Sequence, residues 1–240
     1  RDRSPSRGLG DVYKRQRLVR DVNNSIRARV VLLPANSAGD NIIFHAEGGD
    51  VVLPLLRQQK DGEECLSLSD FVKPCGTDYV GAFAVTAGRG IEEIISGYQQ
   101  TDDFKALLYQ SLSDRLAEAA AELLHARVRR EVWGYAPDER IDRQRALRAQ
   151  YRGIRPAAGY PSLPDQSAIF AIEKIVGFAN VGIAVTPNGA MSPASSVSGL
   201  MIAHPASRYF MIGAIAPDQR RDYAARRGIT EEELSKWLPK

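Results

Sequence analysis

The chain has 240 residues, of which 44% are hydrophobic and 25% charged, so it is long and apolar enough to bury a globular core. It contains neither an uninterrupted apolar run of about eighteen residues nor an apolar leader with a cleavage site, which argues against a membrane span or secretory signal and predicts a cytoplasmic protein. The net charge is +3, but residues 1–16 alone carry five Arg or Lys against two Asp, so the remaining chain is balanced and no nucleic-acid partner is expected.

Residues 1–16 differ in character from the rest of the chain. They read RDRSPSRGLGDVYKRQ, without apolar periodicity, and their end, DVYKRQ, resembles translated sequencing-adapter DNA. We therefore predict a non-native, adapter-derived segment followed by one domain over residues 17–240. A flexible basic arm for nucleic acid is the alternative, but aromatic residues are not interleaved with the basic ones as such an arm requires.

The first part of the body predicts antiparallel strands. Short apolar runs begin at Val30 and span residues 41–45, 48–56 and 79–88. The turn after the first run is assigned to Pro34, Asn36 and Gly39, because these residue types favour turns. The next turn falls at Gly48-Gly49. The short links predict a β-meander rather than parallel strands joined by helices.

Between Asp102 and Trp133 the apolar period changes to three and four residues, which predicts one long amphipathic helix. Its expected apolar positions are Phe104, Leu107, Leu108, Leu112, Leu116, Ala119, Ala120, Leu123, Leu124 and Val128. Acidic residues at its start and arginines at its end suit the helix dipole. His125 lies on this helix, and we expect it to pack there rather than to bind a metal.

A proline-rich stretch, YRGIRPAAGYPSLPD (151–165), follows the helix and is too rich in Pro and Gly for regular structure. Beyond it the pattern predicts a helix over 166–178, strands over 183–186, 197–204 and 210–215, and two helices separated by Gly228. Thr230 and Glu233 form a capping box at the start of the last helix. The whole pattern predicts an α+β domain of antiparallel strands with helices packed against them.

Most candidate motifs carry no chemistry. Gly88-Arg89-Gly90 lacks the third glycine of a dinucleotide-binding fingerprint, where Glu93 stands instead, so it is interpreted as a turn. Cys65 and Cys75 stand without a metal-ligand spacing and are read as ordinary thiols. The histidines are scattered, and no carboxylate or histidine constellation fits acid–base catalysis. We expect neither a metal site nor a catalytic residue.

The proline-rich loop is the exception. Arg155 is a planar, permanently charged donor that can hold a carboxylate through two parallel hydrogen bonds. Residues that suit a flat, cationic ligand follow Arg155. The small residues Ala157, Ala158 and Gly159 and the aromatic Tyr160 come directly after it, and Tyr209 and Phe210 lie further along the chain. Aromatic faces attract cations by up to about 2 kcal/mol when desolvated. Composition alone favours the alternative, in which the arginine holds loop carbonyls and the aromatic rings fill the core.

Six blocks of the sequence, taken in order, resemble the activation domain of cobalamin-dependent methionine synthase. GIRPAAGYPSLPD is similar to the signature loop of that family. The other blocks are VLLPANSAGD, DYVGAFAVTAG, DRLAEAAAELLHARVRREVWGYAPDE, SPASSVSGL and DQRRDYAARRGITEEELSKWL. The similarity extends over residues 17–240, and we expect the chain to be a C-terminal fragment of the larger enzyme. Gln166 departs from the family, which usually has histidine there.

The resemblance implies a C-shaped α+β domain around a twisted antiparallel sheet flanked by helices, with S-adenosylmethionine in an extended groove. Arg155 would bind the methionine carboxylate, and residues 157–160 would line the adenosine and the sulfonium. Tyr209 and Phe210 would close the pocket, with Glu118 as a nearby acidic contact.

The function implied by the resemblance is reactivation of methionine synthase. The domain would present the methyl group of S-adenosylmethionine for reductive methylation of cob(II)alamin, in methionine biosynthesis. Cobalamin would be held by the neighbouring cobalamin-binding domain, and a flavodoxin-like protein would donate the electron. The alternative is a stand-alone domain that senses S-adenosylmethionine without transfer chemistry. An independent metabolic enzyme with its own acid–base site is a third, weaker interpretation.

Overall fold

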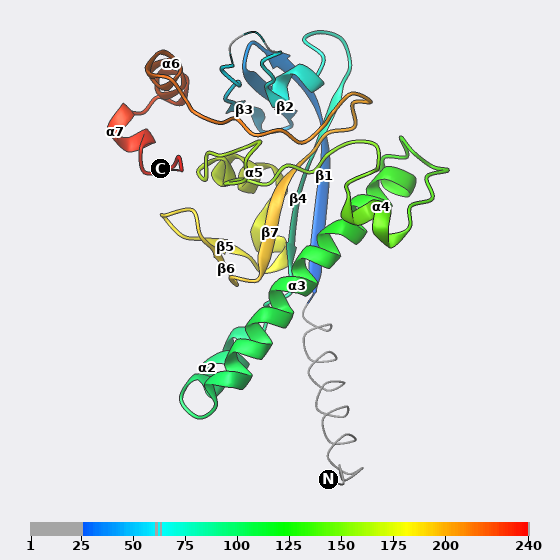
Figure 1. Cartoon of the computed structure of the whole chain (residues 1–240), viewed down its shortest axis with the longest axis vertical. Coiled ribbons are helices and arrows are strands. Elements are labelled where there is room, and N and C mark those ends of the chain that lie inside the picture. The colour runs from blue at the N-terminus through cyan, green and yellow to red at the C-terminus, as the bar shows by residue number, and fades with distance from the viewer. Residues whose placement is uncertain (1–25, 61, 63, 240) are drawn as a thin grey trace. The chain divides into compact units, whose positions relative to one another are not determined.

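The computed structural model describes residues 26–239, except 61 and 63, so the predicted foreign segment lies outside the described residues. Five strands form one antiparallel sheet in the order β3-β2-β1-β4-β7, and β5 pairs with β6 (Figure 1). The strands are β1 (Arg27–Ala38), β2 (Asn41–Ala46), β3 (Gly49–Pro54), β4 (Tyr79–Thr86), β5 (Ala184–Val185), β6 (Met191–Ser192) and β7 (Ser196–Met201). The predicted α+β class is confirmed.

Helical segments lie between β3 and β4, between β4 and β5, and after β7. The α-helices are α2 (Ile91–Gln99), α3 (Asp103–Arg127), α4 (Arg143–Leu147), α5 (Ala168–Val176), α6 (Pro217–Arg227) and α7 (Glu231–Leu234). Two short 3₁₀ turns, η1 (Leu68–Phe71) and η3 (Phe178–Val181), and a π-helical turn, η2 (Val128–Val132), complete the set within the described residues. The π-helical turn continues α3 directly, so the helix predicted to reach Trp133 is confirmed with a local change of pitch.

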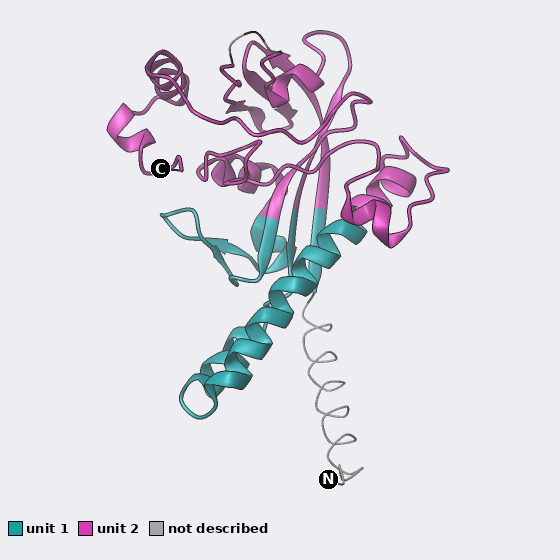
Figure 2. Cartoon of the chain, in the orientation of Figure 1, with its two compact units in different colours: residues 1–29, 84–123, 178–197 teal, residues 30–83, 124–177, 198–240 magenta. Residues whose placement is uncertain are grey.

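The described chain divides into two compact units (Figure 2). Unit 1 comprises the described residues up to Arg29, Ala84–Leu123 and Phe178–Val197, and unit 2 comprises Val30–Phe83, Leu124–Gly177 and Ser198–Lys240. The core of unit 1 contains Ala87, Ile91, Ile95, Ala106, Tyr109 and Ala117. A core cluster of unit 2 contains Leu56, Ile212, Tyr223, Ala224, Leu234 and Leu238. That residues 17–240 form one domain stays a prediction.

The first hairpin corrects one turn prediction. Gly39 takes a left-handed φ of +57° at the turn between β1 and β2, as expected. Pro34 and Asn36, also assigned to that turn, lie inside β1. The Asn36 amide donates to the carbonyl oxygens of Lys73 (3.1 Å) and Gly76 (2.9 Å). These distant partners hold the strand extended where local residue preference favours a turn.

The α3 helix is confirmed, but its predicted apolar face is buried only in part: Leu112 and Leu116 pack against the unit 1 core, whereas other predicted positions face outward. Phe104 is 73% exposed and Leu107 is 64% exposed. The buried positions within unit 1 instead carry smaller or polar side chains, namely Ala106, Tyr109, Ser113, Ala117 and Ala121. The Ser113 hydroxyl donates to the carbonyl oxygen of Ala87 at 2.7 Å. Close packing of the helix on its neighbours selects for small volume, which an apolar-periodicity count does not measure.

The strand predicted over residues 210–215 is absent from the structure. Ile212 is buried and donates its N–H to the Pro161 carbonyl at 3.0 Å, and Gly213 then takes a φ of +79°. The two C-terminal helices are confirmed. Gly228 ends α6 with a φ of +67°, and the Thr230 side chain accepts from Glu233 N–H at 3.2 Å.

Candidate ligand-binding site

The proline-rich loop of unit 2 runs beside β7 without forming a regular strand. Ile154 and Ile202 exchange both backbone hydrogen bonds, each 2.9 Å long. Leu200 N–H then donates to the Pro156 carbonyl at 2.9 Å. The backbone on both sides of Arg155 is therefore fixed to β7.

Gly199 allows this close approach. A Cβ atom at position 199 would lie 2.3 Å from the Pro156 carbonyl oxygen and 2.9 Å from Ala157 Cα. Both are backbone atoms, so the loop could not step aside by turning a side chain. Only glycine lets the loop lie directly on the strand.

The middle of the loop is a compact turn of small residues. Tyr160 N–H donates to the Ala157 carbonyl (3.2 Å), and Gly159 N–H donates to the Leu163 carbonyl (2.9 Å). Gly159 has a φ of +83°, a conformation that favours glycine. Ala158 is half-buried and the Tyr160 ring is 54% exposed. The turn therefore presents backbone and one aromatic face with little side-chain bulk.

Arg155 and Tyr209 come together although 54 positions separate them. The Tyr209 hydroxyl accepts a hydrogen bond from Arg155 N–H at 2.9 Å, while Tyr209 remains 44% exposed. The structure thus brings Arg155, the small-residue turn and Tyr209 into one region of unit 2.

Phe210 and Glu118 are placed differently. The Phe210 ring lies 6.3 Å from the Phe71 ring between centroids, and its backbone exchanges hydrogen bonds with the Ser162 hydroxyl. These contacts tether the loop to the unit 2 core. Glu118 is exposed on the unit 1 part of α3. The parts of Phe210 in closing the pocket and of Glu118 in contacting the ligand stay predictions.

Asp165 anchors the far end of the loop and was missed by the sequence analysis. Its carboxylate is 1% exposed and accepts hydrogen bonds from Tyr223 Oη (2.7 Å), Ser167 N–H (2.8 Å) and Arg227 Nη1. Burial and the nearby carboxylate raise the pKa of Tyr223 above its ordinary value. Tyr223 and Arg227 lie 58 and 62 positions away, so no local spacing in the sequence indicates these two partners.

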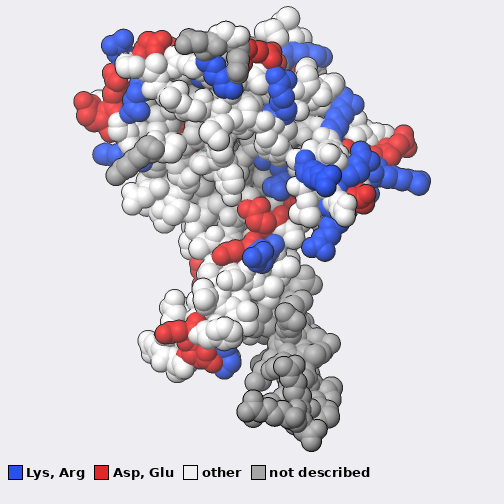
Figure 3. All heavy atoms as spheres, in the orientation of Figure 1, with Lys and Arg blue, Asp and Glu red and all other residues white. Residues whose placement is uncertain are grey.

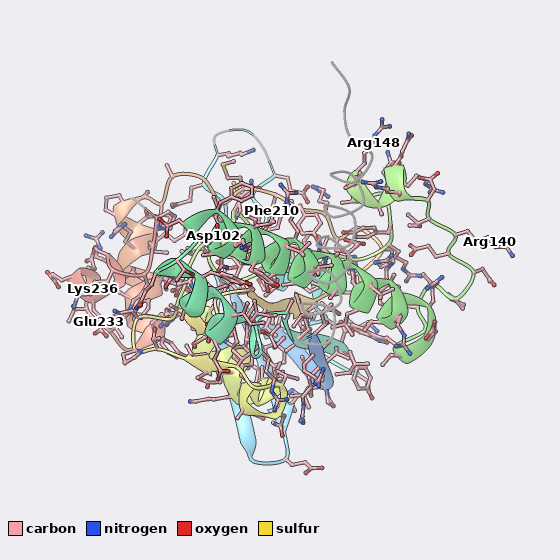
Figure 4. The ribbon with its side chains drawn as sticks, turned by 90° about the horizontal axis from the view of Figure 1, so that it is seen from below. Asp102, Arg140, Arg148, Phe210, Glu233 and Lys236 are labelled. Carbon is pink, nitrogen blue, oxygen red and sulfur yellow. The ribbon has the colours of Figure 1, made fainter. Side chains whose placement is uncertain are left out.

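One arginine near the loop is buried while its neighbours are not. Lys and Arg side chains gather over the segment that carries α4 (Figure 3). Arg140 and Arg148 of this segment are exposed and project outward (Figure 4). Arg129, on the π-helical turn, is instead 2% exposed. Its Nε donates to Glu139 Oε2 at 2.6 Å, whereas its Nη1 has no hydrogen-bond partner among the residues described.

The residues that the structure describes offer neither a membrane-crossing helix nor a cluster of metal ligands. Across residues 26–239, apart from 61 and 63, no helix combines the length and hydropathy needed to cross a membrane. Within the same residues, no group of three or more His, Cys, Asp or Glu side chains is arranged to hold a metal ion.

The fold and the loop define a class: an α+β domain in which one region combines an arginine, exposed backbone and partly exposed tyrosines, the kinds of group found in small-ligand sites. The family model described as "Vitamin B12 dependent methionine synthase, activation domain" matches residues 14–228. The chain belongs to this family. The resemblance found in the sequence is confirmed.

A solved structure is similar over nearly the whole chain. The crystal structure of the MetH reactivation domain bound to AdoHcy is 37% identical, with a TM-score of 0.83. The match covers 94% of this chain and 76% of that one. The α+β fold inferred from the sequence is therefore the fold of a solved reactivation domain.

Proposed function

We propose that this chain binds S-adenosylmethionine at the Arg155 loop and presents its methyl group for reductive methylation of cob(II)alamin, which reactivates methionine synthase. The observation that carries the proposal is the hydrogen bond from Arg155 N–H to Tyr209 Oη, 2.9 Å, beside a turn of small residues. The related reactivation domain bound to AdoHcy supports it, because AdoHcy is S-adenosylmethionine without the transferable methyl group.

The residues of the loop suit the parts of this ligand. The Arg155 guanidinium can pair with the ligand carboxylate through two parallel hydrogen bonds. Ala157, Ala158 and Gly159 allow a flat purine to approach the backbone. Tyr160 and Tyr209 keep 54% and 44% of their surface exposed, and their rings can face the sulfonium cation.

The chain's contribution to the reaction is positioning. S-Adenosylmethionine brings an activated methyl group, whose S–C bonding electrons stay on sulfur when the methyl is transferred. Arg155 and the turn would hold both ends of the ligand so that the methyl faces cobalamin on the neighbouring cobalamin-binding domain of methionine synthase. A flavodoxin-like donor would supply the electron. We place the process in the cytoplasm.

Calorimetric titration of the chain with S-adenosylmethionine tests the binding. Arg155→Ala removes the charged fork and is expected to weaken binding by about 2–4 kcal/mol, which is tenfold or more. Arg155→Lys is expected to rescue poorly, because a point charge cannot reproduce two parallel hydrogen bonds. Arg148→Ala, an exposed arginine on the same unit, is the control and should bind as the parent does. Equal affinity of parent and Arg155→Ala would return Arg155 to a structural role.

A second assay separates a presenting domain from a complete enzyme. The isolated chain should transfer no methyl group to homocysteine. It should methylate cobalamin when a cobalamin-binding domain and a low-potential reductant are added. Homocysteine methylation without cobalamin would instead establish an independent methyltransferase, and binding without any transfer would favour a ligand-sensing domain.

A further inference from the structure

The stretch just before Arg155 is held by side chains from the segment that follows α3. Arg152 N–H donates to Glu139 Oε1 at 3.0 Å, and the Arg152 carbonyl accepts from Tyr135 Oη at 3.4 Å. The Arg152 guanidinium also donates to the Tyr135 carbonyl at 2.9 Å. Both backbone polar groups of Arg152 are therefore bound by side chains. Arg152 lies three residues before Arg155, which is proposed to bind the carboxylate of the ligand.

A second layer fixes those side chains. Arg129 donates to Glu139 Oε2 at 2.6 Å, and its guanidinium lies 4.2 Å from the centre of the Tyr151 ring. His125 Nε2 lies 3.3 Å from Tyr135 Oη. Since the single Tyr135 hydroxyl proton goes to the Arg152 carbonyl, His125 would carry its proton on Nε2 and donate to Tyr135. We call His125, Arg129, Tyr135 and Glu139 the rear clamp.

The His125 ring is suited to this neutral role. Burial, with the Arg129 and Arg155 guanidinium groups nearby, lowers the pKa of His125 to about 2. The ring therefore stays uncharged at neutral pH and acts as a fixed hydrogen-bond donor. The charge effect also places Arg155 within electrostatic reach of the rear clamp.

Gly153 transmits the position of the rear clamp to Arg155. Its φ is +82°, and a Cβ atom there would lie 2.5 Å from Tyr135 Oη and 2.7 Å from the Ile202 carbonyl oxygen. The next residue, Ile154, exchanges two hydrogen bonds with Ile202. The backbone between Tyr135 and Arg155 is thus tightly packed. A shift of Tyr135 must therefore move Arg155 or break one of these contacts.

The rear clamp has features that stability alone does not explain. Arg129 Nη1 and His125 Nδ1 are buried and have no hydrogen-bond partner among the described residues. Buried polar atoms left without partners destabilise a fold, and apolar side chains of similar size would avoid that loss. A π-helical turn, held by the Trp133 N–H to Val128 carbonyl bond of 2.9 Å, carries Arg129 into this position, and such turns are frequent at functional sites.

We propose that Tyr135 is a positioning residue: supported by the rest of the rear clamp, it sets the placement of Arg155 for the ligand carboxylate. The inference rests on the proposed function, because it names the apparatus behind the same binding site. It assigns Tyr135 no contact with the ligand.

A double-mutant cycle tests this, with the Kd for S-adenosylmethionine measured by calorimetry. Tyr135→Phe removes only the hydroxyl and should weaken binding about fivefold in the parent chain, within the range of coupling between residues in one network. In an Arg155→Lys background the same change should weaken binding less than about twofold, because a lysine cannot use the orientation that the clamp provides. Tyr79→Phe, at an exposed tyrosine of the same unit, should leave the Kd unchanged.

The outcomes are distinguishable. Equal losses from Tyr135→Phe in both backgrounds, or no loss in either, would overturn the inference. A parent chain that does not bind S-adenosylmethionine would overturn the proposed function instead. Should Tyr135→Phe unfold, Glu139→Gln replaces it in the same cycle, because it keeps an acceptor for Arg152 N–H while weakening the pair with Arg129. Its loss must likewise vanish in the Arg155→Lys background for the inference to stand.

Discussion

The two ends of the proline-rich loop, residues 151–165, are held by similar pairs of residues that have different effects. Each buries an arginine–carboxylate pair: Arg129–Glu139, with side chains 2% and 14% exposed, and Arg227–Asp165, 19% and 1% exposed. At the Asp165 end, hydrogen bonds reach the carboxylate from several elements. At the Arg129 end, the guanidinium Nη1 has no partner among the described residues.

The difference separates anchoring from positioning. A buried ion pair favours stability only when its remaining donors and acceptors are satisfied. The Asp165 end meets that condition, so its main effect should be on folding. The Arg129 end does not, and it lies behind Arg155, so its main effect should be on ligand geometry. Variants at the two ends can break or sharpen this contrast.

The largest effect is expected at the Asp165 end of the loop, which we call the anchor. Asp165→Ala leaves Arg227 and Tyr223 without their shared acceptor in a buried site, so the free energy of unfolding should fall by about 3–5 kcal/mol. Urea denaturation measures it. Asp222→Ala is the matched control, because Asp222 is 61% exposed in its pair with Arg226, and exposed pairs contribute about 0–1 kcal/mol. Similar losses from the two variants would remove the anchor's special status.

Gly199→Ala should act on the part of the loop between the two ends. Its Cβ would meet the Pro156 carbonyl oxygen at 2.3 Å, which forces the loop away from β7 and should destabilise the fold by about 1–3 kcal/mol. Ligand binding should weaken too, since Ala157 moves with the loop. Gly97→Ala, within α2 and with open space around the new atom, should stabilise slightly. Unchanged unfolding of Gly199→Ala would show that the loop tolerates a gap beside the strand.

The rear clamp predicts a pH dependence of stability. His125 has a pKa of about 2 in the fold against an ordinary 6.5, so between these values the unfolded chain binds a proton that the folded chain does not. The stabilisation from neutral His125 is therefore fully present above pH 6.5. Below that pH the free energy of unfolding falls by about 1.4 kcal/mol per pH unit. Arg129 and Arg155 oppose protonation, and the Tyr135 hydroxyl and the Tyr151 ring face the imidazole.

Denaturation curves of the parent and His125→Gln at pH 7.5 and 5.5 isolate this effect. Glutamine does not titrate, so the parent should lose about 1.4 kcal/mol more than the variant between the two pH values. Equal losses would mean that His125 takes up its proton inside the fold, and that it is not the neutral donor proposed for the rear clamp.

The smallest effect is expected from residues 1–16. We propose that they are foreign to the domain, so a chain lacking them should keep its melting temperature and its Kd for S-adenosylmethionine. A drop of several degrees would show that they belong to the fold, since about 1 kcal/mol moves the midpoint by roughly 2–4 °C for a domain of this size. The same shortened chain serves as the parent for the other variants.

Local patterns determined much of this protein from its sequence alone. Apolar periodicity located α3, proline and glycine content marked the loop around Arg155, and Thr230 with Glu233 marked the start of α7. The order of six sequence blocks indicated the family. The signals for α3, for the loop and for α7 depend on neighbours a few positions apart, where residue preference and helix or strand geometry act directly.

Tertiary structure decided the rest. The buried face of α3 follows small side chains such as Ala117 rather than Leu107, because packing distance to other elements sets the volume allowed. Asn36 lies within a strand because its amide binds the carbonyl oxygens of Lys73 and Gly76, which are 37 and 40 positions away in the sequence. Asp165 and Tyr135 gain their roles from partners that the chain brings together only on folding. Burial and hydrogen bonding depend on contacts distant in sequence, and no local pattern carries that information.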